Sequence, residues 1–359
     1  MKITRLWLVN FRNYENAVIE FADNNLLVGA NGAGKTNILE AVDILATSRS
    51  KIVKGLNKCI RHGQAGFAIN GQFGDLTVAF RQERDADRTV KINDEILAST
   101  SELIGKVNSV IFLPGDLEII QGLPAVRRKY LDIMLSQTEK DYYLDLQVYT
   151  RALKQRNELL KKLRYADVST GSAPDNFTIW ETQLAETGAR ISQKRREILE
   201  FFTAETARLY NEMGFEGTLS LRYKTDVTPD KQANLEALAA ARADDIRLAR
   251  TRFGTHTDDF EFCLDDSKAA EFCSQGQQRL ITVACKCAEV TLKTQKLNDP
   301  PLVLIDDVLL ELDMARLNKI ISAIAPDSQK IFTVTDTGRF SPDILRDMKI
   351  IKIENGQVA

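Results

Sequence analysis

Short apolar stretches separated by polar turns dominate the first hundred residues. Ala17, Ile19 and Phe21 alternate with Val18 and Glu20, which predicts a half-buried strand. Further strands are predicted over 24–28, 66–73, 75–80 and 88–93, because Gly- or Asp-rich turns bound these runs. Between them, residues 37–46 repeat apolar positions at helical spacing and predict one helix.

The middle of the chain has a different pattern. Residues 124 to about 165 are charged and favour helix, and a polar loop at 166–176 separates them from a second helical stretch that reaches about Met213. These two helices predict a short antiparallel hairpin. The second helix carries an apolar stripe that we interpret as core packing: Trp180, Leu184, Ile191, Ile198 and Phe202.

Strands and helices alternate again towards the C-terminus. A strand (217–223) and a helix (231–252) close the middle region, and strands are predicted over 260–264, 301–305, 330–335 and 349–355, with a helix after Ser274. This order predicts an α/β P-loop core with an inserted, mostly helical second lobe. The predicted lobes are 1–123 with 253–359 for lobe I, and 124–252 for lobe II.

Composition narrows the class of protein. The chain has 359 residues, of which 44% are hydrophobic and 27% charged, as is usual for a soluble globular protein. No apolar run approaches the roughly 18 residues of a membrane span, so we expect a cytoplasmic protein without a membrane partner. Five cysteines without a C-x-x-C pair and only two histidines make a zinc or disulfide framework improbable.

The charge distribution is uneven although the net charge is only −2. Between 124 and 165, ten basic residues stand against five acidic ones, and this stretch is a candidate for phosphate contacts. A solvated helix face is an equally good interpretation. The basic residues are Arg127, Arg128, Lys129, Lys140, Arg151, Lys154, Arg156, Lys161, Lys162 and Arg164.

A glycine-rich motif follows the strand predicted at 24–28. It fits G-x-x-x-x-G-K-[ST], in which backbone N–H groups surround the phosphates of a nucleotide. Lys35 is expected to reach the β- and γ-phosphates and Thr36 to bind Mg²⁺. A chance glycine-rich turn is disfavoured by the strand before it and the helix after it. The predicted ATP-binding residues are Gly29, Ala30, Asn31, Gly32, Ala33, Gly34, Lys35, Thr36 and Asn37.

The apolar run LVLIDD (302–307) ends in two aspartates. The strand is expected to bring Asp306 to the Mg²⁺ ion, as a Walker-B aspartate does. Asp307 follows at a position where a carboxylate polarises an attacking water, so Asp307 and Lys35 are the predicted catalytic residues. Read alone, the two aspartates also fit a turn that caps a helix.

Residues 273–285 (CSQGQQRLITVAC) place a second small, polar, glycine-containing turn before a helix. Ser274, Gln275, Gly276 and Gln277 have the features of an anion site, because the helix start offers free N–H groups and the glycine permits close approach. The loop at 29–36 already serves the chain's own nucleotide, so this turn is predicted to contact the γ-phosphate held by a second copy. A plain capped helix is the alternative.

These motifs together resemble the RecF family of DNA repair proteins, relatives of the ATP-binding-cassette heads of Rad50 and SMC proteins. The similarity rests on 29–36, on 274–279 and on 306–313, and it extends to 8–14, 60–63, 112–117 and 127–132. It implies a two-lobed head without a long coiled coil that dimerises on ATP, binds DNA at single-/double-stranded junctions or gaps, and hydrolyses ATP slowly. It also implies work with RecO and RecR in loading RecA, and roles in repair, replication and the SOS response.

The chain departs from the family pattern at four positions, one of which is Gly115, where the family commonly has an acidic residue. Thr255 and Thr257 replace the proline and arginine of Gly-Pro-His-Arg-Asp-Asp, and Leu310 replaces the serine before Glu-Leu-Asp. Two other functions stay open at this level: another ATP-binding-cassette subunit, and an ATP-binding scaffold of a repair complex with negligible turnover.

Overall fold

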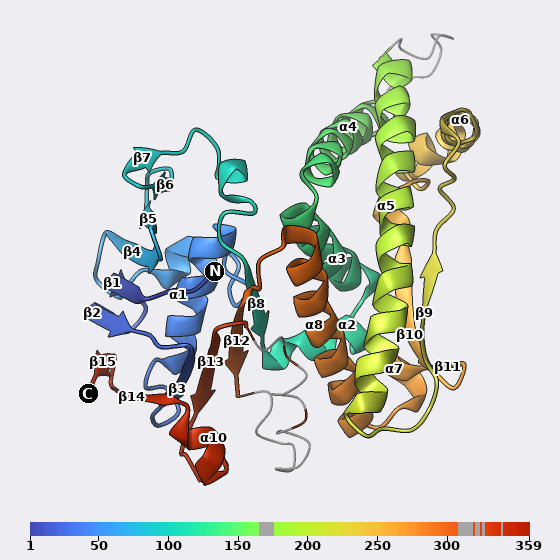
Figure 1. Cartoon of the computed structure of the whole chain (residues 1–359). Coiled ribbons are helices and arrows are strands. Elements are labelled where there is room, and N and C mark those ends of the chain that lie inside the picture. Colours follow the sequence, from blue (N-terminus) through green and yellow to red (C-terminus); the bar gives the residue numbers. More distant parts are fainter. Residues whose placement is uncertain (165–175, 308–318, 320–323, 325–326, 339) are drawn as a thin grey trace. The chain divides into compact units, whose positions relative to one another are not determined.

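The computed structural model describes residues 1–164, 176–307, 319, 324, 327–338 and 340–359 (Figure 1). The chain forms two compact units, which we describe separately. Unit 1 comprises Met1–Asp116, Glu212–Phe215 and Val283–Ala359, and unit 2 comprises Leu117–Asn211 and Glu216–Thr282.

The first sheet of unit 1 is antiparallel and has the strand order β2-β1-β4-β5-β6-β7. Strands that follow one another in the sequence form most of its pairs. The turns between them therefore mark where its strands begin and end. The strands are β1 (Arg5–Phe11), β2 (Tyr14–Glu20), β4 (Gly66–Phe73), β5 (Leu76–Glu83), β6 (Thr89–Ile92) and β7 (Glu95–Ile96).

The second sheet of unit 1 has the order β15-β14-β3-β13-β12-β8 and is parallel except at its β15 edge. Its central strands are buried along their length, which matches their continuous apolar sequence. Its strands are β3 (Asn24–Val28), β8 (Ser109–Phe112), β12 (Leu302–Asp306), β13 (Lys330–Val334), β14 (Lys349–Glu354) and β15 (Gln357–Val358).

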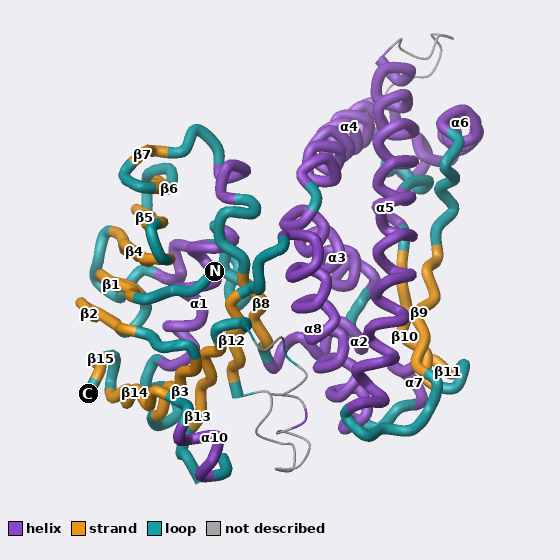
Figure 2. The backbone as a smooth tube through the Cα atoms, viewed as in Figure 1, coloured by secondary structure: helices purple, strands orange, loops and turns teal. Residues whose placement is uncertain are grey.

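Helix α1 (Lys35–Thr47) packs against strands of both sheets, and one apolar core joins the three layers (Figure 2). Ile38, Leu39, Val42 and Leu45 of α1 are fully buried there. The helix therefore has a fixed position relative to β3 and β12, whose ends carry the predicted nucleotide motifs. Unit 1 also contains α10 (Pro342–Arg346) and short 3₁₀ turns at 56–59, 100–103 and 114–117.

Unit 2 is mostly helical. Helices α4 and α5 run antiparallel, as their cross-helix ion pairs Arg156–Glu181 and Arg190–Asp145 show. The apolar stripe of α5 is buried at Leu184, Ile191, Ile198 and Phe202 and half-buried at Trp180. The elements are α2 (Glu118–Gln121), α3 (Pro124–Thr138), α4 (Lys140–Arg164), α5 (Asn176–Glu212), α6 (Lys231–Leu248), α7 (Ala269–Phe272) and α8 (Gln275–Leu297), and the strands β9 (Leu219–Lys224), β10 (Asp259–Leu264) and β11 (Ser267–Lys268). The last part of α8 belongs to unit 1.

The observed division differs from the predicted lobes mainly at residues 253–282, which belong to unit 2, and also at 117–123 (unit 2) and 212–215 (unit 1). The physical reason is the antiparallel pairing of β10 with β9, which attaches this segment to the helical unit. Strands β1 and β8 have no counterpart among the predicted elements. The helical stretch predicted from 124 is two helices, because the chain is extended at Glu139.

Candidate nucleotide-binding site

The glycine-rich loop joins β3 to α1 at the end of the parallel sheet. Two of its glycines are required by geometry. A Cβ on Gly29 would lie 2.2 Å from the carbonyl oxygen of Ile353, and a Cβ on Gly34, at φ 116°, would lie 2.7 Å from the side-chain amide of Asn13. The motif therefore has the strand–loop–helix context that the sequence predicts.

Two residues of the β1–β2 turn hold this loop in place. Asn13 Nδ2 donates to Ala33 O at 2.9 Å, and the hydroxyl of Tyr14 donates to Gly34 O at 3.0 Å. Asn37 Nδ2 in turn donates to Asn13 Oδ1 at 2.8 Å. These loop contacts were absent from the predicted site; the only sequence signal for them was the resemblance of residues 8–14 to the family.

Lys35 folds over the loop. Its Nζ donates to Gly29 O at 2.7 Å and to Ala30 O at 3.0 Å, and the residue is 5% exposed. The first N–H groups of α1 have no acceptor within the helix and carry the positive end of its dipole. The loop thus combines an ammonium group with backbone donors, which is an arrangement suited to bind the phosphates of a nucleotide.

The hydroxyl of Thr36 and the carboxylate of Asp306 lie together, as predicted. Thr36 Oγ1 donates to Asp306 Oδ1 at 2.7 Å, and Thr333 Oγ1 at the end of β13 donates to the same oxygen at 2.8 Å. Thr333 also accepts from the backbone N–H of Asp307 at 3.2 Å. The sequence did not reveal Thr333, because a threonine in an apolar strand carries no distinctive signal.

Asp307 is half-buried beside this group. Its Oδ1 is buried and has no hydrogen-bond partner among the described residues. Burial raises the pKa of Asp307, and the neighbouring Asp306 carboxylate raises it further, whereas Lys35 opposes the shift. The side chain is therefore a better proton acceptor than an ordinary aspartate when it is ionised.

The second turn lies in unit 2, at the start of α8. Ser274 N donates to Gln277 Oε1 at 2.9 Å, and Gln277 N donates to Ser274 Oγ at 3.3 Å, so the two residues cap the helix reciprocally. Ser274, Gln275 and Gly276 are nevertheless exposed. The turn caps the start of α8 and is also exposed. The two predicted interpretations, a helix cap and an anion site, are therefore compatible.

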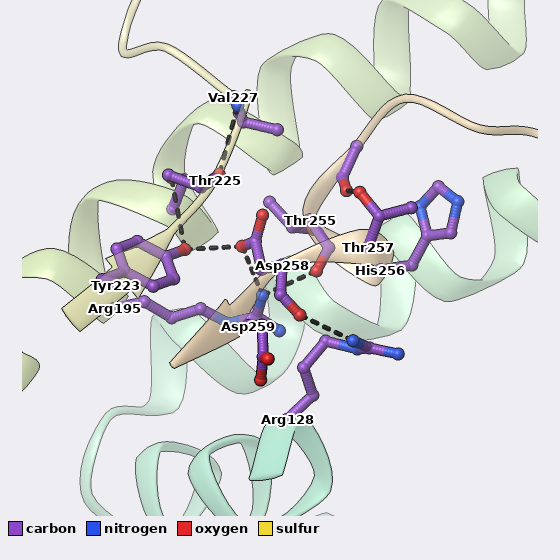
Figure 3. Close-up of polar contacts among 12 residues, drawn as sticks. Arg128, Arg195, Tyr223, Thr225, Val227, Thr255, His256, Thr257, Asp258 and Asp259 are labelled. Atoms are coloured by element: carbon purple, nitrogen blue, oxygen red, sulfur yellow. Dashed lines mark hydrogen bonds and ion pairs between the residues drawn. The ribbon is translucent and has the colours of Figure 1, made fainter. Parts of the chain in front are cut away.

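The segment that departs from the family pattern at Thr255 and Thr257 lies inside a polar network of unit 2 (Figure 3). Asp258 Oδ2 accepts from Arg195 Nη1 at 2.7 Å and from the hydroxyl of Tyr223 at 2.5 Å. Thr255 O accepts from Arg195 at 2.7 Å, whereas Thr257 is exposed. This segment holds unit 2 together. Leu310 lies outside the described residues.

Two of the basic candidates for phosphate contact are buried and a third is half-buried, which corrects part of the sequence interpretation. Arg127 forms a two-bond pair with Asp259, Arg128 donates to Asp258 O, and Arg156 is fully buried. Arg156 pairs with Asp245 and Glu181. A buried guanidinium needs such partners, and a count of charges along the sequence does not reveal them.

Two wider features bear on the site. Within the described ranges, no helix is sufficiently long and apolar to cross a membrane. The same part of the chain contains no cluster of three or more His, Cys, Asp or Glu residues arranged for a metal ion. A metal at Thr36 and Asp306 would thus depend on further oxygens from elsewhere, as Mg²⁺ at a nucleotide does.

The fold and the site define the head of an SMC-type ATPase, and comparison with known proteins agrees. The family model for the RecF/RecN/SMC N-terminal domain matches residues 2–357. Smc heads have this fold, for example the head bound to the C-terminal winged-helix domain of ScpA (16% identity, TM-score 0.56, 100% of this chain and 96% of that one).

Relatives with higher sequence identity belong to one family within this class. DNA replication and repair protein RecF of Synechococcus sp. (strain JA-3-3Ab) is 36% identical, with 100% of this chain and 97% of the relative covered. The structure of the recombination mediator protein RecF-ATP in the RecFOR pathway has a TM-score of 0.90 at 28% identity, covering 99% of this chain and 96% of that one. The chain belongs to the RecF family of DNA replication and repair proteins. The predicted family and fold class are confirmed.

Proposed function

We propose that this chain is an ATP-gated DNA-binding protein of recombinational repair. The observation that carries the proposal is the hydrogen-bonded group Thr36–Asp306–Thr333 beneath a glycine-rich loop closed by Lys35. It joins the loop after β3 to the ends of β12 and β13. These are the parts needed to bind a nucleoside triphosphate with its cation at the edge of a parallel sheet.

ATP is the ligand that the loop fits. The backbone N–H groups of the predicted residues, Gly29 to Asn37, surround the phosphates, and Lys35 exchanges its loop carbonyl acceptors for phosphate oxygens. The related structure of the recombination mediator protein RecF-ATP has the same fold over nearly its full length, which supports this assignment.

The residues also fit Mg²⁺. Two hard oxygen donors, Thr36 Oγ1 and Asp306 Oδ1, already lie 2.7 Å apart. Asp307 follows Asp306 in the chain, and its buried Oδ1 has no hydrogen-bond partner among the residues that the structure describes. When bound, the ion neutralises the charge that develops between the β- and γ-phosphates. Thr36 and Asp306 hold it, and Thr333 orients Asp306.

Asp307 is the proposed general base. It accepts a proton from the attacking water, for which its raised pKa is suited. An aspartate is one methylene shorter than a glutamate, so we expect slow turnover. The chain is chiefly an ATP-dependent switch and only weakly an ATPase.

The turn at Ser274–Gln277 is proposed to complete the site of a second copy. Ser274, Gln275 and Gly276 are exposed on unit 2, whereas the chain's own loop lies in unit 1. Two copies would then close around two ATP molecules, and hydrolysis would release them.

The biological setting follows from relatives named for DNA replication and repair and for the RecFOR pathway. We extend to this chain the binding of DNA, with a preference for single-/double-stranded junctions or gaps. The partners would be RecO and RecR, and indirectly RecA, in the cytoplasm.

Two variants test the proposal. Asp307→Asn should abolish DNA-stimulated phosphate release while ATP binding remains, and unchanged hydrolysis would refute its role as base. Ser274→Arg should prevent dimerisation in sedimentation experiments with a non-hydrolysable ATP analogue, while the monomer still binds the analogue. Normal dimers of Ser274→Arg would contradict the shared site.

A further inference from the structure

The outward face of α4 carries a row of basic side chains, which we call the α4 stripe: Lys140, Arg151, Lys154, Lys161 and Lys162. All five are exposed. At about 100° per residue they fall within roughly 100° of arc, and they extend over about 33 Å of the helix axis. Helix α4 is a 25-residue helix of unit 2 (Figure 2). Four of the five cations lie between residues 151 and 162, and Lys140 stands at the start of the helix.

The stripe carries an excess of positive charge. None of its five cations forms an ion pair with any residue that the structure describes. Glu158 is the one acidic residue within the same arc, and it pairs with none of them in the described part of the chain.

The neighbouring helices treat their surface cations differently. On α5 and α6, each of the following has a carboxylate partner: Arg190 with Asp145 and Glu186, Lys194 with Glu197, Arg208 with Glu205, Lys231 with Glu186, and Arg247 with Asp244. Within the described residues, the cations of the α4 stripe thus lack the carboxylate partners that these cations of α5 and α6 have, in a chain whose net charge is negative. A solvated helix face would not require this segregation.

We propose that the α4 stripe binds the sugar–phosphate backbone of duplex DNA. This inference rests on the proposed function, and it names the surface that meets the DNA. A straight row of cations about 33 Å long can lie along the axis of a straight duplex. The duplex presents one negative charge per roughly 1.7 Å of that axis. Unpaired, exposed lysines and arginines provide such contacts without reading base sequence.

A charge-matched pair of variants tests the assignment. The stripe variant combines Arg151→Gln, Lys154→Gln, Lys161→Gln and Lys162→Gln. The paired-cation variant combines Arg190→Gln, Lys194→Gln, Arg208→Gln and Arg247→Gln, and it removes the same charge from α5 and α6. Fluorescence anisotropy with a labelled duplex, at several salt concentrations and with a non-hydrolysable ATP analogue, gives the affinity and its salt slope for each protein.

We expect the stripe variant to bind the duplex more than tenfold more weakly and to lose about three to four units of salt slope. The paired-cation variant should stay within about threefold of the wild type, because a neighbouring carboxylate already offsets each of these four cations. Equal losses in both variants would assign the effect to net charge and overturn the proposal. So would a stripe variant that binds like the wild type.

Two further measurements separate the remaining explanations. Polyglutamate that binds the wild type as tightly as the duplex, and loses that binding in the stripe variant, would identify an acidic polypeptide as the partner and overturn the DNA assignment. A wild type that binds no duplex at low salt, with ATP binding intact, would refute the proposed function itself. Thermal unfolding of both variants verifies that each is folded.

Discussion

The chain begins two helices with a small, glycine-containing polar turn, and the two turns differ in how they are held. The loop before α1 is constrained by Asn13, Tyr14 and Lys35, and a Cβ on its last glycine would clash. The turn before α8 is exposed at Ser274, Gln275 and Gly276, and its hydrogen bonds include the reciprocal cap of Ser274 and Gln277.

The difference indicates two kinds of phosphate site. A loop whose donors are fixed in advance loses little entropy on binding and can hold a nucleotide by itself. An exposed turn with free space around its glycine provides few contacts alone. It gains a function when a second surface supplies the remainder of the site, which is why we assign it to dimerisation.

The largest expected effect is in the first loop. Gly34→Ala places a Cβ 2.7 Å from the Asn13 amide and 2.8 Å from the Tyr14 hydroxyl, at a φ of 116°. Strain of about 3 kcal/mol or more should follow, and ATP affinity should fall at least about a hundredfold. Equilibrium binding of a fluorescent ATP analogue measures this. Lys54→Ala, on an exposed loop, is the control, and retained affinity in Gly34→Ala would remove the contrast between the turns.

Gly276→Ala is the matched change in the second turn. Only Ser274 Oγ lies near the position of the new Cβ, at 4.0 Å, so the monomer should be as stable as the wild type or up to about 1 kcal/mol more stable. Its ATP affinity should not change. Dimerisation with an ATP analogue should weaken about tenfold if the turn approaches a partner's nucleotide closely. Full dimerisation by this variant would leave the turn as a simple helix cap.

Asn13→Ala tests the constraint on the loop without a clash. It removes the hydrogen bond to Ala33 O and the acceptor of Asn37. Each bond contributes about 1 kcal/mol, so ATP affinity should fall about five- to tenfold while the fold survives. Asn70→Ala, in β4 of the same sheet, is a control for general weakening. An affinity equal to that of the wild type would show that the loop keeps its shape without Asn13.

The sequence predicts local features of this molecule better than contacts between distant segments. The strand 66–73 was predicted at its observed bounds, and the glycine-rich loop, Thr36 and Asp306 meet as expected. Turn residues and apolar runs encode these features locally. Asn13 and Thr333 were absent from the predicted site, because their roles depend on strands brought together by the fold.

Charges show the same limit. In α8, Lys286 and Lys293 are buried and pair with the buried Glu289, with 3.2 Å from Lys293 Nζ to Glu289 Oε1. In the sequence they resemble an ordinary solvated helix face. Arg156 and Arg127 were likewise candidates for phosphate contact before the structure showed their internal partners. The role of a charged side chain depends on its burial and on its ion-pair partners. Both are set by the folded unit and cannot be seen in the sequence.

The smallest predicted effect is a pH dependence of the free energy of unfolding that comes from unit 2, the unit that carries the second turn. His256 belongs to unit 2, where its Nε2–H donates to Thr251 O at 3.0 Å and Nδ1 lies 2.7 Å from the Tyr149 hydroxyl. Burial is the main cause that lowers the pKa of His256 in the folded protein. Below the unfolded value of about 6.5, the unfolded chain therefore binds a proton that the folded unit resists.

Stability should accordingly decline slightly as the pH falls from about 7 to 5.5, and it should level off below the folded pKa. Urea unfolding followed at several pH values measures the slope, and His256→Gln should flatten it. An unchanged slope in His256→Gln would show that the acid sensitivity arises from other groups.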